Sequence, residues 1–190
     1  LSMSLFSRRP ERISVPALSH SLRVLLIADT HGLLDTRILT LGHECDLILH
    51  AGDIGGKAVI QALQGTGRPW LAVRGNNDLP GRWGDGSDDR LPERLWIELP
   101  TGLIGLLHSH QHNPISARHA QIRADFFETR AVVYGHSHRL VCDLDERPWV
   151  LNPGAAGRVR TYGGPSCILL HIHGERWQPE PIRFPPLPMG

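Results

Sequence analysis

The chain has 190 residues, of which 41% are hydrophobic and 21% are charged, and its formal net charge is +1. These values are typical of a single globular domain with a substantial core, and they exclude a strongly basic or acidic protein that binds its partner through net charge. No apolar run approaches the ~20 residues of a membrane-spanning helix, and the first residues lack a signal-peptide segment.

The three cysteines, Cys45, Cys142 and Cys167, suggest no disulfide framework. Reduced thiols next to apolar residues are expected in a cytoplasmic protein.

Residues 1–20 contain arginines and prolines without periodicity, so a loosely ordered N-terminal arm is expected. The apolar run from Val24 to Ala28 predicts a strand over 22–28 that is buried on both faces. Apolar spacing over 33–41 predicts a helix that ends at Gly42.

Two further strands, over 45–51 and 70–73, flank a helix expected over 56–63. This alternation of strands and helices with short connections indicates a parallel sheet with right-handed crossovers. The Gly- and Asp-rich stretch 79–93 is expected to be a long surface loop next to the substrate.

Strands over 95–99 and 103–108 are predicted to form a hairpin, and a helix is expected from Pro114 to about Phe127. A strand over 131–134 follows.

Short runs at 140–144, 148–151 and 167–172 predict antiparallel strands. We expect a single domain over 21–178, followed by an extended Pro-rich tail over 179–190.

Polar side chains follow several of these strands. Asp29 and His31 leave the first strand two positions apart, and in an extended backbone such side chains point to the same side. His136 and His138 repeat the spacing, while Asp53 and Asn76 each follow a glycine. Carboxylates, imidazoles and an amide oxygen form a mixed ligand set that suits Mn, Zn, Fe, Ni or Co better than Ca or Mg.

These motifs resemble those of the calcineurin-like metallophosphoesterases, in the order of that family, over roughly residues 22–175. They are Asp29-x-His31, Gly52-Asp53, Gly75-Asn76-x-Asp78, the His108 of His108-Ser109-His110, and Gly135-His136-Ser137-His138. The small size and Asn152-Pro153-Gly154 are similar to the small bacterial and archaeal phosphodiesterase branch, which resembles Vps29 in fold.

The resemblance implies an α/β fold, a four-layer α/β/β/α sandwich of two mixed sheets with flanking helices. It also implies two divalent metal ions, for which manganese is the leading candidate. Asp29, His31, Asp53 and His138 would hold one ion; Asp53, as a bridge, Asn76, His108 and His136 would hold the other. Asp53, Asn76 and His108 would then serve in catalysis, and a hydroxide between the metals would attack phosphorus in line.

Two positions depart from the family pattern. Asn77 stands where many relatives have a histidine that protonates the leaving group, and an amide does not titrate near neutral pH. We therefore expect a preference for leaving groups that need little protonation, unless His110 or a water supplies the proton. Ser109 stands where glycine is common and is expected to crowd the backbone near the second metal.

The leading hypothesis is a metal-dependent phosphodiesterase that acts on a small phosphoester or nucleotide-like substrate, without a membrane or a stable nucleic-acid partner. The alternatives are a phosphomonoesterase, a dinucleoside polyphosphate hydrolase, and a Vps29-like scaffold that binds proteins.

Taken singly, each Asp motif also suits an ordinary turn. Gly55-Gly56-Lys57 faintly suggests a phosphate-binding P-loop, but the glycine spacing is one residue short and Ala58 replaces the Ser or Thr. The sequence leaves the oligomeric state open.

Overall fold

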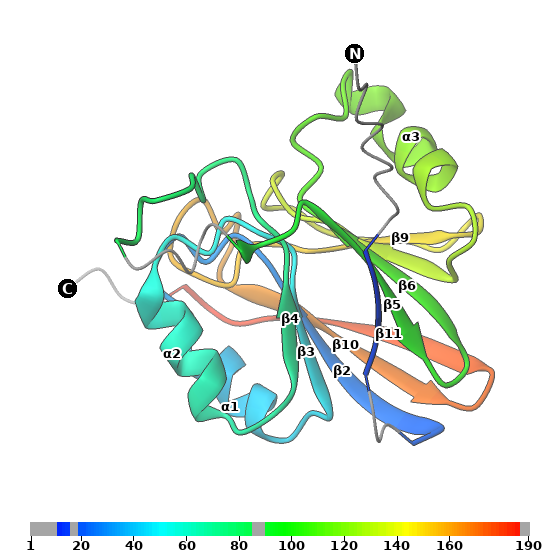
Figure 1. Ribbon diagram of the computed structural model, residues 1–190, viewed down its shortest axis with the longest axis horizontal. Helices are drawn as coiled ribbons and strands as arrows, with labels where there is room; N and C mark the ends of the chain where they lie inside the picture. The colour runs from blue at the N-terminus through cyan, green and yellow to red at the C-terminus, as the bar shows by residue number, and fades with distance from the viewer. Residues whose placement is uncertain (1–10, 16–18, 85–89, 187–190) are drawn as a thin grey trace, which may run out of the picture.

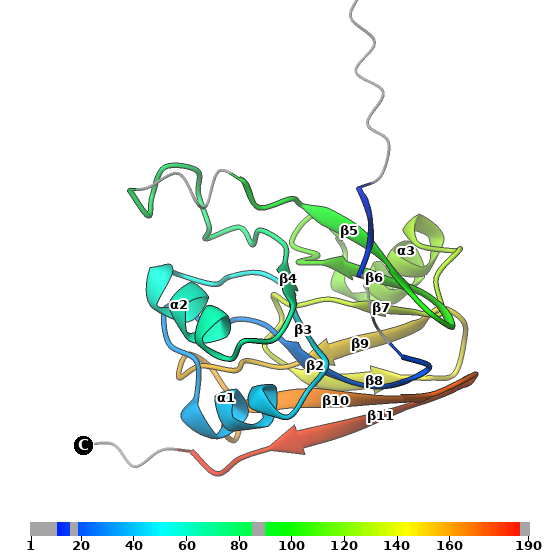
Figure 2. The same cartoon turned by 60° about the horizontal axis from the view of Figure 1, so that its bottom comes forward.

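The structure is a computed structural model that describes residues 11–15, 19–84 and 90–186. Two mixed β-sheets pack face to face, with α1 and α2 outside one sheet and α3 outside the other (Figures 1 and 2). This arrangement confirms the expected four-layer α/β/β/α sandwich.

The first sheet has five strands in the order β11-β10-β2-β3-β4. The strands β2, β3 and β4 run parallel, whereas β10 is antiparallel to both β2 and β11. Its elements, with the two helices that cover it, are β2 (Ser21–Ile27), α1 (Thr36–His43), β3 (Leu47–His50), α2 (Lys57–Gly65), β4 (Trp70–Ala72), β10 (Ser166–His173) and β11 (Arg176–Arg183).

The second sheet has six strands in the order β1-β5-β6-β7-β9-β8. Its elements are β1 (Arg12–Ser14), β5 (Arg94–Leu99), β6 (Gly102–Leu107), β7 (Ala131–Val133), β8 (Leu140–Asp143) and β9 (Trp149–Pro153), with a 3-10 turn (Ile115–Ala117) and α3 (Arg118–Asp125) outside. The helix expected over 114–127 is thus shorter and begins after a cis Asn113–Pro114 bond and the 3-10 turn.

Alternation along β2 explains the layers. Val24 and Leu26 belong to the core between the two sheets, while Leu25 and Ile27 pack against the side that carries α1 and α2. Because successive side chains of a strand point to opposite faces, the apolar run at the end of β2 serves both interfaces. Each such side chain contributes about 1.5–3 kcal/mol on burial.

The position of α1 differs from the prediction at both ends. The helix begins at Thr36 because the Asp35 carboxylate accepts a hydrogen bond from the Arg37 N–H and caps the first turn. Gly42 does not end the helix. It lies buried inside the last turn, where an added Cβ would lie 3.2 Å from Ile48 Cδ1, so the glycine serves close packing of α1 on β3.

The late strands are not all antiparallel, contrary to the prediction. β9 is antiparallel to β8 but parallel to β7, because β8 forms the edge of the sheet and the chain then turns back to insert β9 between β8 and β7. Two segments outside residues 21–178 also pair with the sheets: β1 runs beside β5, and β11 extends through Pro179 and Pro181 to Arg183. Prolines are tolerated there because β11 is an edge strand.

Cys45, Cys142 and Cys167 carry free thiols, as expected. No helix within the described ranges is long and apolar enough to span a bilayer. Of the expected surface loop, residues 85–89 lie outside the described residues.

Candidate metal centre

The candidate metal centre lies where loops leave the carboxyl ends of strands in both sheets. The carboxyl ends of parallel strands share one edge of a sheet, so the loops that follow them meet there. Seven side chains named from the sequence come from these loops: Asp29 and His31 after β2, Asp53 after β3, Asn76 after β4, His108 after β6, and His136 and His138 after β7.

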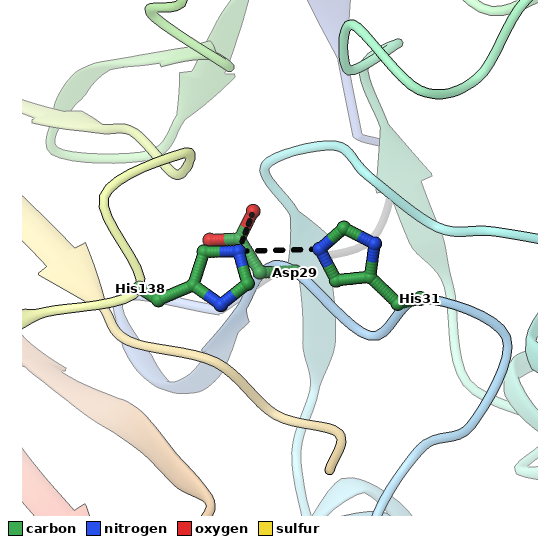
Figure 3. A group of neighbouring side chains, drawn as sticks. All are labelled: Asp29, His31 and His138. Atoms are coloured by element: carbon green, nitrogen blue, oxygen red, sulfur yellow. Dashed lines mark hydrogen bonds and ion pairs between the residues drawn. The ribbon is translucent and has the colours of Figure 1, made fainter. Parts of the chain in front are cut away.

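A first cluster consists of Asp29, His31 and His138, whose ligand atoms lie close enough together to hold one metal ion. The Nε2 atoms of His31 and His138 are 3.2 Å apart, and His138 Nε2 lies 3.6 Å from Asp29 Oδ1. Figure 3 shows the two imidazoles and the carboxylate turned toward one another, with Asp29 and His31 on the loop after β2 and His138 on the loop after β7.

A second cluster consists of Asp29, Asp53 and His108 and can hold another ion. His108 Nε2 lies 3.4 Å from Asp53 Oδ2 and 4.0 Å from Asp29 Oδ1. The same Asp53 Oδ2 atom is 3.7 Å from His31 Nε2, so this carboxylate faces both clusters.

Asn76 adds a neutral oxygen beside the second cluster. Its Oδ1 atom lies 3.1 Å from His108 Nε2 and 3.0 Å from His136 Nδ1. A series of contacts no longer than 4.0 Å therefore connects all seven side chains.

Backbone carbonyls orient two of the histidines. The Nδ1 atom of His108 lies 2.8 Å from the Ala51 carbonyl oxygen, and that of His138 lies 2.9 Å from the Val159 carbonyl oxygen. An Nδ1–H that donates to a carbonyl leaves the Nε2 lone pair directed at the clusters, which is the usual arrangement of metal-binding histidines.

Asp29 is the buried group that fits a cation best. Burial raises its pKa to about 7, and the neighbouring Asp53 carboxylate acts in the same direction. Its Oδ2 atom is buried without a hydrogen-bond partner among the described residues. A metal ion would satisfy this oxygen and offset the cost of a buried negative charge.

Three of the four histidines are in the neutral state that metal binding needs. Burial lowers the pKa of His136 to about 4 and also lowers those of His31 and His138, so these imidazoles are neutral near pH 7. For the fourth, His108, burial opposes protonation, but the hydrogen bond to Asp53 and the Asp29 charge raise the pKa above its usual value. Burial opposes ionisation of Asp53, but hydrogen bonds from His108 and Asn77 together hold its pKa below the usual range.

Five of the seven residues have a left-handed backbone, with φ between 44° and 70°: Asp29, His31, Asp53, His136 and His138. Such angles are uncommon outside glycine and cluster at functional sites, where neighbouring structure holds them in place. Here the Asp29 and His31 N–H groups donate to the carbonyls of Gly52 and Asp53, at 3.0 Å each.

Glycines permit the close approach of these loops. A Cβ on Gly75 would lie 2.1 Å from Asp53 Oδ1, and one on Gly52 would lie 2.8 Å from the His108 Nδ1 atom. Larger residues at either position would displace a side chain of the centre.

Asp78 ties two of the loops together. Its carboxylate accepts hydrogen bonds from the backbone N–H groups of Ile54, Gly55 and Gly75 at 2.9–3.0 Å. Asn77 donates from its backbone and from its side chain to the two Asp53 oxygens, at 2.9 and 2.7 Å.

Ser109 does not point into the centre. It is buried, its Oγ lies 3.2 Å from His112 Nδ1, and His112 Nε2 lies 3.1 Å from Asp125 Oδ2. The serine side chain thus connects this loop to α3 through His112. Asn152 similarly holds the loop after β7, since its amide donates to Ser137 Oγ at 2.9 Å.

Arg160 lies at the edge of the centre but was missed from the sequence. Its Nη2 atom is 3.2 Å from His138 Nε2, although the guanidinium comes from an exposed loop that follows β9. The only local signal is a pair of arginines shortly after Asn152-Pro153-Gly154, which does not distinguish Arg158 from Arg160.

Solved structures with this fold include several Vps29 proteins and small prokaryotic phosphoesterases. Vps29 from Cryptosporidium parvum has 20% identity and a TM-score of 0.68, over 87% of this chain and 98% of its own. Vps29 from Entamoeba histolytica, solved in complex with Zn²⁺, has 22% identity and a TM-score of 0.67, over 85% and 99%. An archaeal phosphodiesterase has 20% identity and a TM-score of 0.64, over 85% and 100%.

At these identities the structures show the fold alone. No curated protein matches the sequence. The family model of the calcineurin-like phosphoesterase superfamily domain matches residues 22–175, which is most of the chain. This protein belongs to the calcineurin-like phosphoesterase superfamily.

Proposed function

We propose that this protein is a metal-dependent phosphoesterase that hydrolyses phosphodiesters with two divalent ions, for which manganese is the leading candidate. One ion would be held by Asp29, His31, Asp53 and His138, and the other by Asp53, Asn76, His108 and His136. Bound ions of this kind lower the pKa of water and neutralise charge on phosphoryl oxygens.

The position of Asp53 carries this proposal. Its Oδ2 atom lies 3.7 Å from His31 Nε2 and 3.4 Å from His108 Nε2, one from each side of the centre. A carboxylate that faces both clusters can bridge two ions. The unpartnered Asp29 Oδ2 atom next to it supports a cation at the same place.

The protein's own groups then orient and neutralise the substrate. Asn76 contributes an oxygen without a negative charge, so it does not repel a phosphate. The Arg160 guanidinium, 3.2 Å from His138 Nε2, adds a positive charge at the edge of the centre.

Asn77 bears on which leaving groups the centre can expel. The backbone N–H and the side-chain amide of Asn77 both donate to Asp53. An amide cannot donate a proton to an alkoxide. We therefore propose a preference for aryl or otherwise stabilised leaving groups. Phosphomonoesters and dinucleoside polyphosphates are the competing substrates within the same chemistry.

A protein-binding scaffold like Vps29 is the competing function, and the similarity of fold is its support. The observation that favours an enzyme over a scaffold is that all seven candidate metal ligands are present and lie in contact with one another.

The test compares the protein with Asp53→Asn after incubation with Mn²⁺. Bound metal is measured by inductively coupled plasma mass spectrometry, and hydrolysis is measured with bis(p-nitrophenyl) phosphate. We expect Asp53→Asn to lower turnover by more than about 100-fold and to lose metal, because the bridging charge is gone.

Asp145→Asn, at an exposed turn between β8 and β9, is the matched control and should behave like the parent. A parent protein that binds no metal and turns over no substrate, with Asp53→Asn indistinguishable from it, would support the scaffold instead.

A further inference from the structure

A pocket of about 460 Å³ adjoins the metal centre. Its lining residues are His31, Gly55, Gly56, Lys57, Asn77, Arg82 and Trp83. His31 belongs to the first metal cluster, and Asn77 donates to Asp53, so the pocket opens directly beside the centre. Its volume lies within the range of about 300–1,000 Å³ that small-molecule sites occupy.

The lining has the chemistry of an anion site. Lys57 and Arg82 are exposed cations, and within the described part of the chain no acidic residue lines the pocket. An ammonium and a guanidinium group in one pocket favour a phosphate, which both bind through charge-assisted hydrogen bonds.

Trp83 supplies a flat apolar wall. Its half-buried indole packs against the core cluster between the five-stranded sheet and the helices α1 and α2. An indole held in this way offers a face on which an aromatic ring can stack.

Close packing fixes this pocket relative to His31. A Cβ on Gly55 would lie 2.3 Å from the Gly32 N atom and 2.7 Å from His31 Cα, so the backbones of the two loops are in direct contact at this glycine. The Gly32 N–H donates to the Ile54 carbonyl at 2.8 Å. The Gly55-Gly56-Lys57 stretch, which does not fit a P-loop, thus forms part of the lining of this pocket.

A larger cavity of about 770 Å³ lies elsewhere, between β1, β5 and the end of α3. It contains none of the seven side chains of the metal centre, and its arginines already pair with its acids: Arg12 with Glu128, and Arg94 with Asp125 at 2.9 Å. The lining carries four acidic residues, Glu11, Glu93, Asp125 and Glu128, against two arginines, so this cavity does not favour an anion.

We propose that the smaller pocket binds one arm of the substrate, and that this arm is a nucleotide: a flat base stacked on Trp83, with a second phosphate held by Lys57 and Arg82. The substrate class is then a phosphodiester whose nucleoside carries a further phosphate. This inference rests on the proposed function and specifies its substrate.

Three esters with the same leaving group test the proposal: methyl p-nitrophenyl phosphate, thymidine 3′-(p-nitrophenyl phosphate), and the same thymidine ester with a 5′-phosphate. The ratio of kcat/KM between the second and first esters reports the base, and the ratio between the third and second reports the added phosphate. All are measured with the Mn²⁺-loaded protein.

The double variant Lys57→Gln/Arg82→Gln should lower the phosphate ratio by roughly 10-fold or more, as expected for lost charge-assisted hydrogen bonds. Trp83→Leu should lower the base ratio by about 5-fold or more, because stacking is lost. Arg176→Gln is the control and should leave both ratios unchanged, since Arg176 lies at the end of the sheet where β2 begins, opposite the metal centre.

A binding measurement separates this inference from the proposed function. Isothermal titration calorimetry should give tighter binding of thymidine 3′,5′-bisphosphate than of thymidine 3′-phosphate, and the double variant should lose that preference. If no ester is hydrolysed but the preference is present, the proposed function fails and the pocket stands. Equal binding of the two nucleotides by the parent protein, or an unchanged ratio in either variant, overturns the pocket assignment.

Discussion

The Nε2 atoms of His31 and His138 lie 3.2 Å apart, although 107 positions separate the two residues in the chain. His31 follows a strand of the five-stranded sheet, and His138 follows a strand of the six-stranded sheet. The first metal cluster therefore depends on the packing of the two sheets, and an unfolded chain does not contain it.

Metal binding should stabilise the folded state for this reason. At a free metal concentration about 100 times the Kd, we expect Mn²⁺ or Zn²⁺ to raise the free energy of unfolding by about 2.7 kcal/mol. Asp29→Asn should lose most of this increase, because the buried carboxylate with the unpartnered Oδ2 is removed. The increase is measured by urea denaturation with metal and with a chelator, and Asp145→Asn should retain it. An increase of the same size in Asp29→Asn would contradict the role of Asp29.

Gly75→Ala should disable the centre without altering any ligand. The new Cβ would lie 2.1 Å from Asp53 Oδ1 and 2.2 Å from Asp53 N, so the carboxylate must move. We expect metal affinity, measured by calorimetry, to fall by about 10-fold or more. Gly65→Ala, at the end of α2 where nothing lies within 4 Å of the added Cβ, is the matched control and should bind metal normally. Normal metal binding by Gly75→Ala would show that the loop relaxes.

The absence of a titratable group at position 77 should be visible in substrate preference. We expect the parent protein to hydrolyse an aryl diester much faster than the dinucleotide ApA, whose leaving group is an alkoxide. Asn77→His should raise the rate on ApA relative to the aryl diester by at least about 10-fold, because a general acid assists only the poor leaving group. Asn77→Ser, which adds no acid near neutral pH, should not. Equal rates of the parent protein on both substrates would remove the basis of this interpretation.

Arg160→Ala should weaken catalysis more than Arg160→Lys. The guanidinium lies 3.2 Å from His138 Nε2, where it can contact phosphoryl oxygens of a bound substrate. Loss of a hydrogen bond between charged groups predicts a fall in kcat/KM of about 10-fold or more for the alanine variant, with a partial recovery by lysine. Steady-state kinetics on bis(p-nitrophenyl) phosphate measure both, with Arg176→Ala as the control. If Arg160→Ala matched that control, the arginine would have no role in the reaction.

The cap of α1 should make stability depend on pH. Hydrogen bonds from Arg37 lower the pKa of Asp35 below its ordinary value of 3.8, so the folded state favours the ionised carboxylate. This stabilisation is complete above that ordinary value and is lost as the pH falls through the lower pKa of the folded state. Asp35→Ala should therefore lower the free energy of unfolding by about 1 kcal/mol at pH 7.

The loss should shrink when the same urea denaturation is repeated near pH 3. Asp145→Ala, at an exposed position, should show no such trend. A loss of equal size at both pH values would show that the Asp35 charge does not contribute.

Local patterns in the sequence determined much of this protein. The apolar runs before Asp29, Asp53 and His136 predicted β2, β3 and β7, because a strand buried on both faces needs an unbroken run of apolar side chains. The same runs predicted where polar side chains leave the sheet. The start of α1 was misjudged because the periodic run includes Leu33 and Leu34, whereas the Asp35 cap sets the first turn.

The tertiary structure decided contacts that neither the local patterns nor the family resemblance predicted. The direction of β9 depends on its pairing with β7, and the approach of Arg160 to His138 depends on a loop that crosses from another strand. Likewise, Lys57 and Trp83 share a pocket only because the loops after β3 and β4 lie side by side. Contacts of this kind join residues far apart in the chain, and their energy comes from packing that no local run of residues encodes.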